Sequence, residues 1–455
     1  QYALRDRYIF TVTIRADGSS KFPLHKWGYF PSGGFAWRAI DEKFMTGVPV
    51  ISDLKFRVTY GLTGNESIAP YSSYTSYGPN NYPPVESGQL VVGVMPTQLG
   101  SDALKWETTI QQNLGIDLGL FNSRIQITAD FYVKKSKDLL LKAPLSNYSG
   151  FSTVTRNIGD MQVKGMEYNL STLNLNGKFK WSTDFNIAFN KTKVLKLNEG
   201  QDYFYTGNVG RYGDAYGNPY IVKVGHELGS FFGYINDGIG HTQEELSVAP
   251  QHNSLVTKQG VRKYKDVSGP DGKPDGKIDI NDRTVIGNGN PKFFGGFTNS
   301  FSYGSFELSF LFTYSYGNDI LNADKALFQQ PMSYQGGTLD MFDRWTPRNP
   351  QINGQRWDLS FVNEYSYASS FLIEDGSYLR LKNIQLAYNM DKELLKKLPI
   401  KSVRVYFTAQ NLLTFTHYTG YDPEVNFLNS IITPGADLGA YPRSKVYTFG
   451  LNLAF

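Results

Sequence analysis

The sequence predicts an all-β protein, a transmembrane antiparallel β-barrel with long extracellular loops. The first observation is a repeated alternation of large apolar residues with small or polar ones, which is the period of a strand with two different faces. The second is that no run of residues approaches the roughly 18 apolar positions needed for a membrane helix. The third is that short and long connections alternate between the predicted strands, as they do in outer-membrane barrels.

Composition agrees with a barrel and excludes several other classes. The chain has 455 residues, with 45 Gly, 31 Tyr and 31 Phe against only 7 Met, which is typical of a chain rich in strands and turns. It contains no cysteine, so disulfides, cysteine zinc sites and thiol catalysis are excluded. The net charge of +4 is small for this length and no long Lys/Arg run occurs, so we expect no nucleic-acid partner.

The alternation is clearest at the carboxyl end, where Tyr447, Phe449, Leu451, Leu453 and Phe455 share one face. Small or polar residues fill the other face, as in a barrel wall with lipid on one side and a polar lumen on the other. The pattern predicts about twelve strands, near residues 8–15, 35–38, 54–63, 106–118, 124–134, 166–170, 179–190, 297–301, 306–315, 378–389, 403–410 and 446–455.

One strand changes its parity part-way along. Leu379 and Leu381 share one face, but the next apolar positions are Ile384 and the alternate residues after it. A β-bulge near Lys382 and Asn383 would restore the register.

The connections give the expected orientation. The short ones are residues 39–53, 121–123, 173–178, 303–305 and 391–401, the last with a short helix around residues 394–398. The long ones are residues 17–26, 64–103, 138–162, 194–292, 317–377 and 412–443. If the long connections are extracellular, the last strand ends in the periplasm at Phe455.

A soluble sandwich or solenoid is the alternative fold, because its strands also alternate. No fixed-period repeat supports a solenoid. Charged residues such as Arg57, Lys134, Asp184 and Arg404 lie in strand centres opposite a continuous apolar face. This pattern favours the membrane barrel.

An acidic stretch in the longest connection predicts a calcium loop, in which oxygens from alternate positions surround a hard cation. The predicted ligands are Asp271, Asp275, the Lys277 carbonyl, Asp279 and Asp282. Lys273 stands where an oxygen ligand is expected, and Asp282 replaces the usual bidentate Glu. A second register begins at Asp266 with Ser268. The alternative is a polar surface loop without metal.

Aromatic residues crowd two of the long loops. They are Tyr71, Tyr74, Tyr77 and Tyr82 in one loop, and Tyr203, Tyr205, Tyr212 and Tyr216 in another. Such rings stack on sugars or contact peptide side chains, so we predict that they bind substrate. The alternative is that they pack the loops onto their neighbours.

Catalytic motifs are missing from the sequence. The five histidines are scattered, and His241 with Glu244 and Glu245 lacks the second histidine of a zinc-protease helix. Neither a nucleophile-elbow serine nor a phosphate-binding loop occurs. We therefore predict that the protein is not an enzyme.

Several segments in one order resemble the SusC/RagA family of TonB-dependent outer-membrane transporters. They are Asp17–Phe22, Trp27–Ser32, Leu54–Asn65, Asp275–Gly287, Asn290–Phe297, Tyr378–Ile384, Gln410–Leu413 and Gly420–Glu424. The resemblance covers essentially the whole chain.

The resemblance implies a plugged barrel of about 22 strands, of which residues 1–455 are the carboxyl-terminal portion. The amino-terminal plug domain and the first barrel strands are then absent from this chain, which begins at Gln1 without an initiator Met or a signal peptide. A half barrel alone would expose two unpaired strand edges to lipid, so another segment or chain must supply the remaining strands.

The resemblance also implies function and partners. It implies uptake of oligomeric nutrients, glycan or peptide fragments, across the outer membrane of a Gram-negative bacterium. TonB would act through the missing amino-terminal part, a SusD-like surface lipoprotein would form a lid, and two such pairs would form a dimer. The alternative function is a surface binding or adhesin barrel without transport, which would lack an upstream plug and a TonB-contacting segment.

Overall fold

The computed structural model describes residues 1–82, 91–151, 153–198, 200–207, 218–252, 258–328, 337–350, 367–396 and 399–455. The chain divides into two compact units, residues 1–172 with 190–202, and residues 173–189 with 203–455. Within these described ranges, no helix is both long enough and apolar enough to cross a membrane.

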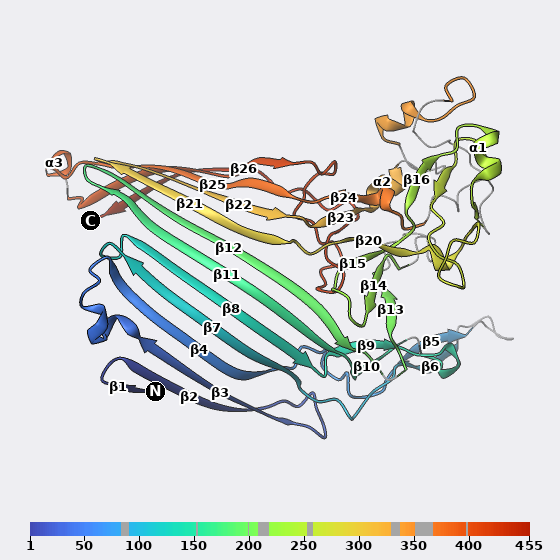
Figure 1. Ribbon diagram of the computed structural model, residues 1–455, viewed down its shortest axis with the longest axis horizontal. Coiled ribbons are helices and arrows are strands. Elements are labelled where there is room, and N and C mark those ends of the chain that lie inside the picture. Colours follow the sequence, from blue (N-terminus) through green and yellow to red (C-terminus); the bar gives the residue numbers. More distant parts are fainter. Residues whose placement is uncertain are drawn as a thin grey trace. The chain divides into compact units, whose positions relative to one another are not determined.

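Long antiparallel strands form the framework of each unit, and their spatial order follows the sequence (Figure 1). In the first unit they are β1 (Tyr2–Leu4), β2 (Tyr8–Gly18), β3 (Trp27–Arg38), β4 (Ile51–Asn65), β7 (Glu107–Leu120), β8 (Ile125–Lys137) and β11 (Asp160–Asn176). In the second unit they are β12 (Phe179–Lys196), β21 (Phe293–Tyr303), β22 (Phe306–Tyr316), β25 (Tyr378–Asn389), β26 (Ser402–Thr416) and β28 (Val446–Ala454). β11 and β12 each contribute residues to both units.

The antiparallel sheet predicted from alternation is confirmed, with 13 strands in its order. The strand that the sequence did not predict is β1, because its 3 residues are too few to show a period. The predicted alternation of short and long connections is also confirmed.

The two faces of these strands differ as the sequence predicts. On the apolar face, Val12 of β2 is 74% exposed and Phe449 of β28 is 81% exposed. On the polar face of the first unit, Arg57 of β4 forms ion pairs with Asp117 at 2.9 Å and Asp130 at 3.1 Å. Among the described residues, apolar side chains of β2 and β28 are therefore open on one face, while ion pairs link neighbouring strands on the polar face of the first unit.

The bulge predicted in β25 is present. Leu381 pairs with Leu413 and Asn383 with Gln410, so Lys382 of β25 stands opposite two residues of β26, Asn411 and Leu412. The pairing of β25 with β22 shifts at the same place. Against β22, Lys382 is therefore one extra residue of β25, and it restores the apolar face beyond the bulge.

Short turns close one end of the sheet in each unit. The turn after β3 contains the 3-10 helices η1 (Ala39–Asp41) and η2 (Lys43–Met45). Between them, the Glu42 carboxylate accepts hydrogen bonds from the Tyr8 hydroxyl at 2.6 Å and the Arg7 guanidinium at 3.1 Å. The helix predicted after β25 is present as α3 (Lys392–Leu395), while residues 397 and 398 lie outside the described ranges.

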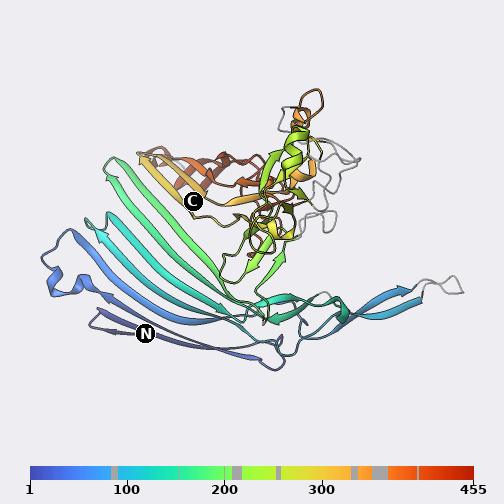
Figure 2. The same cartoon turned by 45° about the vertical axis from the view of Figure 1, so that its right-hand side comes forward.

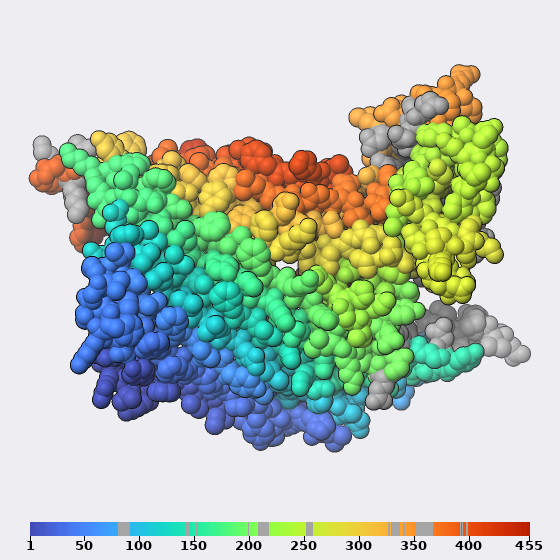
Figure 3. Space-filling view, in the orientation of Figure 1, coloured from blue at the N-terminus to red at the C-terminus, as the bar shows by residue number. Residues whose placement is uncertain are grey.

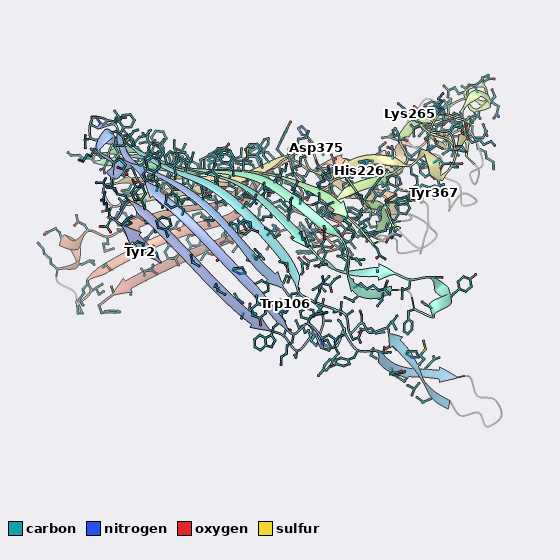
Figure 4. The ribbon with its side chains drawn as sticks, turned by 60° about the horizontal axis from the view of Figure 1, so that its bottom comes forward. Tyr2, Trp106, His226, Lys265, Tyr367 and Asp375 are labelled. Carbon is teal, nitrogen blue, oxygen red and sulfur yellow. The ribbon has the colours of Figure 1, made fainter. Side chains whose placement is uncertain are left out.

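At the other end of the first unit, two hairpins follow the long strands. They are β5 (Ser76–Tyr82) with β6 (Val91–Gln98), which extends away from the main strands, and β9 (Leu140–Pro144) with β10 (Thr153–Asn157) (Figure 2). The loop between β2 and β3 is anchored here by Phe22, which is fully buried against the Trp106 ring, 5.5 Å between centroids. Figure 4 shows Trp106 and Tyr2 toward opposite ends of this sheet.

The long connections of the second unit fold into small sheets of their own. β13 (Tyr203–Thr206), β14 (Tyr220–Lys223), β15 (Ser230–Gly233) and β20 (Thr284–Asn288) form one sheet, and β24 (Ile373–Asp375), β23 (Asp319–Asn322) and β27 (Ala436–Asp437) form another. Smaller elements are β16 (Asn236–Ile239), β18 (Arg262–Tyr264), β17 (Gln251–His252), β19 (Lys277–Ile278), α1 (Gln243–Val248), α2 (Ala323–Phe328), η5 (Ile280–Asp282), η6 (Leu339–Asp343) and η8 (Ser370–Leu372).

A hydrophobic core unites these loops, which we call the loop core. Its buried members are Tyr220, Phe231, Leu321, Leu372 and Ala436, contributed by five different elements. Figure 3 shows the yellow-green and yellow part of the chain, which contains several of these loop elements, as one continuous mass. The long loops of this unit are therefore a packed structure that can hold functional side chains in fixed positions.

Candidate functional site

The four-stranded loop sheet fixes a cluster of aromatic rings. Tyr220 of β14 and Phe231 of β15 are register partners, and their ring centroids lie 4.8 Å apart inside the loop core. The Tyr220 hydroxyl donates a 2.7 Å hydrogen bond to the Pro434 carbonyl, and burial raises the pKa of this phenol far above its ordinary value. Tyr220 therefore stays a protonated donor that ties the loop before β28 to this sheet.

The residue after Phe231 belongs to a second group of rings. The Phe232 ring stacks on the Tyr205 ring at 5.4 Å, and Tyr205 also contacts Tyr203 at 5.3 Å. The guanidinium carbon of Arg283 lies 5.0 Å from the centroids of both the Tyr205 and Phe232 rings. We call Tyr203, Tyr205, Phe232 and Arg283 the aromatic–arginine site.

Burial and the neighbouring Tyr203 raise the pKa of Tyr205 above its ordinary value, although the Arg283 charge acts in the opposite direction. The phenol of Tyr205 is therefore neutral at physiological pH. Tyr203 is 48% exposed. The site thus offers an open aromatic ring, phenol hydroxyls and one cation to a molecule arriving from solvent.

A buried ion network holds the loop of residues 417–445. Arg380 of β25 is 2% exposed, and it donates to Asp422 at 2.6 Å and to Glu424 at 3.0 Å. Glu424 also accepts hydrogen bonds from Tyr378 and Lys382 and forms an ion pair with Arg443. We call Arg380, Asp422 and Glu424 the arginine clasp.

The clasp sets the ionisation of Asp422. Burial alone would raise the pKa of this carboxyl, but the Arg380 guanidinium and the backbone N–H groups of Glu424 and Arg443 outweigh burial and lower the pKa below its ordinary 3.8. Asp422 is therefore a carboxylate near neutral pH. Its charge and that of Glu424 offset the buried cation of Arg380.

The predicted calcium ligands have other partners. Asp282 is fully buried, and its carboxylate accepts backbone hydrogen bonds from Val267 at 2.8 Å, Ser268 at 3.2 Å and Asp279 at 2.8 Å. The carboxylate of Asp266 accepts from the backbone N–H groups of residues 275 and 276.

Asp271 and Asp275 are exposed, and the Asp275 carboxylate accepts from the Lys277 backbone N–H at 3.0 Å. Over the part of the chain that the structure describes, no three acidic or histidine side chains are arranged to hold a metal ion. The carboxylates of Asp266, Asp275 and Asp282 thus accept backbone hydrogen bonds within the loop, and calcium binding stays a prediction.

The predicted binding tyrosines fall into two groups. Tyr71, Tyr74 and Tyr77 belong to the first unit and are 76%, 55% and 67% exposed. Tyr203 and Tyr205 belong to the second unit and contact each other. The side chain of Tyr82 and all of Tyr212 and Tyr216 lie outside the described residues.

Sequence reasoning missed Phe232 and Arg283 as site residues. No local pattern marks them, because they meet Tyr205 only through the pairing of β13, β14 and β15. Arg283 lies in segment 275–287, and the two halves of the arginine clasp lie in segments 378–384 and 420–424; all three segments carry the family resemblance. The resemblance marked these segments, but the contacts between their side chains became visible only in the folded structure.

Comparison with known proteins decides the family. The model for "TonB dependent receptor-like, beta-barrel" matches residues 1–253. The chain belongs to this family. The family is one of outer-membrane proteins, so the exposed apolar face of the main strands faces lipid.

Curated TonB-dependent receptors match along the whole chain, and one of them is named SusC, which confirms the resemblance predicted from the motifs. "TonB-dependent receptor P3" of Formosa agariphila is 37% identical, covering 100% of this chain and 44% of the relative. "TonB-dependent receptor SusC" of Bacteroides thetaiotaomicron is 31% identical, covering 100% of this chain and 43% of the relative.

Among solved structures, the RagAB peptide transporter is similar with a TM-score of 0.82 and 26% identity, covering 99% of this chain and 46% of that chain. The chain therefore spans less than half the length of the relatives it matches.

Proposed function

We propose that this chain forms the carboxyl-terminal wall and extracellular loops of a TonB-dependent importer of oligomeric nutrients, glycan or peptide fragments, and that it has no catalytic role. The observation that carries the proposal is the similarity in fold to the RagAB peptide transporter over 99% of the chain, at a TM-score of 0.82. The relative named SusC supports the same class.

In this proposal the remainder of a longer protein supplies the plug, the first strands and the contact with TonB. A SusD-like lipoprotein closes over the loops, and two such pairs form a dimer. The packing of the loops supports a lid, because the loop core and the arginine clasp hold one rigid outer surface. A lid needs such a surface to close against in a reproducible position.

The loops also supply the residues that contact the nutrient. The exposed rings of Tyr71, Tyr74 and Tyr77, and the aromatic–arginine site, present aromatic faces of the kind that bind sugars and peptide side chains. The polar strand faces, such as that of Arg57, line the path inside the barrel.

The test is nutrient depletion by the native host. A strain with an in-frame deletion of the gene, its complemented strain and the parent are each grown on mixtures of oligosaccharides and oligopeptides. Mass spectrometry then measures which oligomers leave the medium. We expect one class of oligomer to persist only in the deletion culture, and complementation to restore its uptake.

Unchanged depletion in the deletion strain would contradict import. A binding barrel without transport would give a different result, because the oligomer would be retained on the cell surface and recovered intact by washing.

A further inference from the structure

The guanidinium of Arg283 is fixed in position by its surroundings. Its Nη2 atom donates hydrogen bonds to the carbonyl oxygens of Asn218 and Phe232, both at 3.2 Å. The two rings of Tyr205 and Phe232 lie 5.0 Å from its central carbon. These contacts leave Arg283 little freedom to turn toward another partner.

No acid neutralises this cation among the residues that the structure describes. Asp282, its neighbour in sequence, directs its carboxylate to the backbone of residues 267, 268 and 279 instead. The groups that act on the Arg283 charge are the phenols of Tyr234 and Tyr205. Burial lowers the pKa of this guanidinium, although it remains far above neutral.

Two other arginines show what a paired guanidinium looks like in this chain. Arg57 contacts the carboxylates of Asp117 and Asp130, and Arg380 contacts those of Asp422 and Glu424. Each of these cations therefore has two acids, whereas Arg283 has main-chain carbonyls and rings. A half-buried charge without a counter-ion costs free energy unless a ligand supplies the opposite charge.

The remaining donors of Arg283 are available to a ligand. Hydrogen bonds within the described chain use Nη2, while Nε and Nη1 have no protein acceptor there and are not sealed from solvent. The Nε–H and Nη1–H groups lie on different edges of the guanidinium, so each can donate to a separate oxygen of an anionic ligand.

The same cluster has a surface for the rest of the ligand. The Tyr203 ring contacts the Tyr205 ring and is 48% exposed. An open ring face stacks on the C–H face of a sugar, and phenol hydroxyls suit its hydroxyl groups. The chemistry of the cluster therefore favours an acidic sugar over a neutral one.

We propose that the aromatic–arginine site recognises a uronic acid unit of an oligosaccharide, with the carboxylate on Arg283 and the sugar ring on Tyr203. This inference rests on the proposed function, because it names the substrate class of the importer. It adds that Arg283 makes uptake selective for negatively charged sugars.

The test uses the full-length protein with its partner chains, purified in detergent. The probes are oligomers of galacturonate, glucuronate, mannuronate and guluronate, each paired with its methyl ester, which keeps the sugar and removes the charge. Calorimetry measures the dissociation constants. We expect the natural protein to bind at least one acid about tenfold or more tightly than its ester, since a hydrogen bond between two charged groups is stronger than one to a neutral ester oxygen.

Three variants separate the roles. Arg283→Gln should bind acid and ester equally, and Arg283→Lys should keep part of the preference because it keeps the positive charge but not the positions of the guanidinium donors. Tyr203→Ala should weaken acid and ester by the same factor. Arg262→Gln is the matched control, because Arg262 also lies over a ring, that of Phe371, but outside this site. It should bind like the natural protein.

Several outcomes would overturn the inference. They are a natural protein that binds none of the acids, a Gln variant that still prefers the acid, and a charge preference seen only with peptides that have a free carboxyl terminus. If the protein binds no uronate but the host still depletes another oligomer in a TonB-dependent way, uronate recognition is rejected. The proposed function as an importer then remains in place.

Discussion

Arg380 and Arg283 lie in the same unit with opposite surroundings. Arg380 is enclosed by two acids, and Arg283 by rings and carbonyls. The sequence predicted Tyr203 and Tyr205 as binding residues from their crowding alone. It could not predict Phe232 or Arg283 beside them, because the residues that form this contact are up to 80 positions apart (203 to 283) and meet only in the folded loop sheet.

Removing Arg380 should release the loop of residues 417–445. Arg380→Met leaves the carboxylate of Asp422 buried without its cation, while Glu424 keeps Lys382 and Arg443. We therefore expect the free energy of local opening to fall by about 3 to 5 kcal/mol. Hydrogen–deuterium exchange of this loop in the full-length protein measures the change.

The matched control for Arg380→Met is Lys396→Ala, which breaks an exposed ion pair with Glu393 and should have little effect on exchange. A triple variant that also carries Asp422→Asn and Glu424→Gln should recover part of the lost protection. Unchanged exchange in Arg380→Met would show that the clasp does not hold the loop.

The same loop should respond to acid. Because the pKa of Asp422 is lower in the folded loop than its ordinary 3.8, its stabilising contribution is fully present above that value and is lost as the pH falls through the folded pKa. Pepsin cleavage of the loop should therefore accelerate below about pH 4. The Asp422→Asn variant should be cleaved readily at all pH values tested, and a natural protein with the same flat profile would contradict the assignment.

At the scale of elements, the long strands and their connections could be predicted because each strand carries its own period. The bulge at Lys382 was predicted from a change of parity, and the structure confirms it. β1 and the small loop sheets could not be predicted. Their strands have 2 to 5 residues, as in β27 (2 residues), and β27 pairs with β23, more than 100 positions earlier (322 to 436). Such pairs leave no periodic signal.

Deleting Lys382 should prevent assembly, whereas replacing it should not. Without this extra residue relative to β22, the part of β25 from Asn383 onward moves by one position, and its apolar side chains turn to the polar face. We expect the deletion variant to be lost from the outer-membrane fraction. Lys382→Ala keeps the backbone register and loses one contact to Glu424, so it should assemble normally. Normal assembly of the deletion variant would refute the role of the bulge.

At the scale of the whole molecule, the chain combines a membrane wall with a packed group of loops. The strands of the wall need only apolar residues alternating with polar ones, and charged residues on the polar face. Because each strand carries this pattern by itself, the fold class could be predicted from the sequence. The loops need a hydrophobic core of their own, built by residues such as Tyr220 and Leu372 from distant segments. We infer that this division lets the wall stay constant in fold while the loops determine the nutrient.

The most direct test of import is the fate of the depleted oligomer when TonB is removed. The oligomer identified in the depletion experiment is labelled and given to the parent strain, to a strain without TonB, and to a strain without this gene. We predict surface binding and accumulation in the parent, binding without accumulation in the strain without TonB, and neither in the strain without the gene. Accumulation that continues without TonB, or without this gene, would contradict the account.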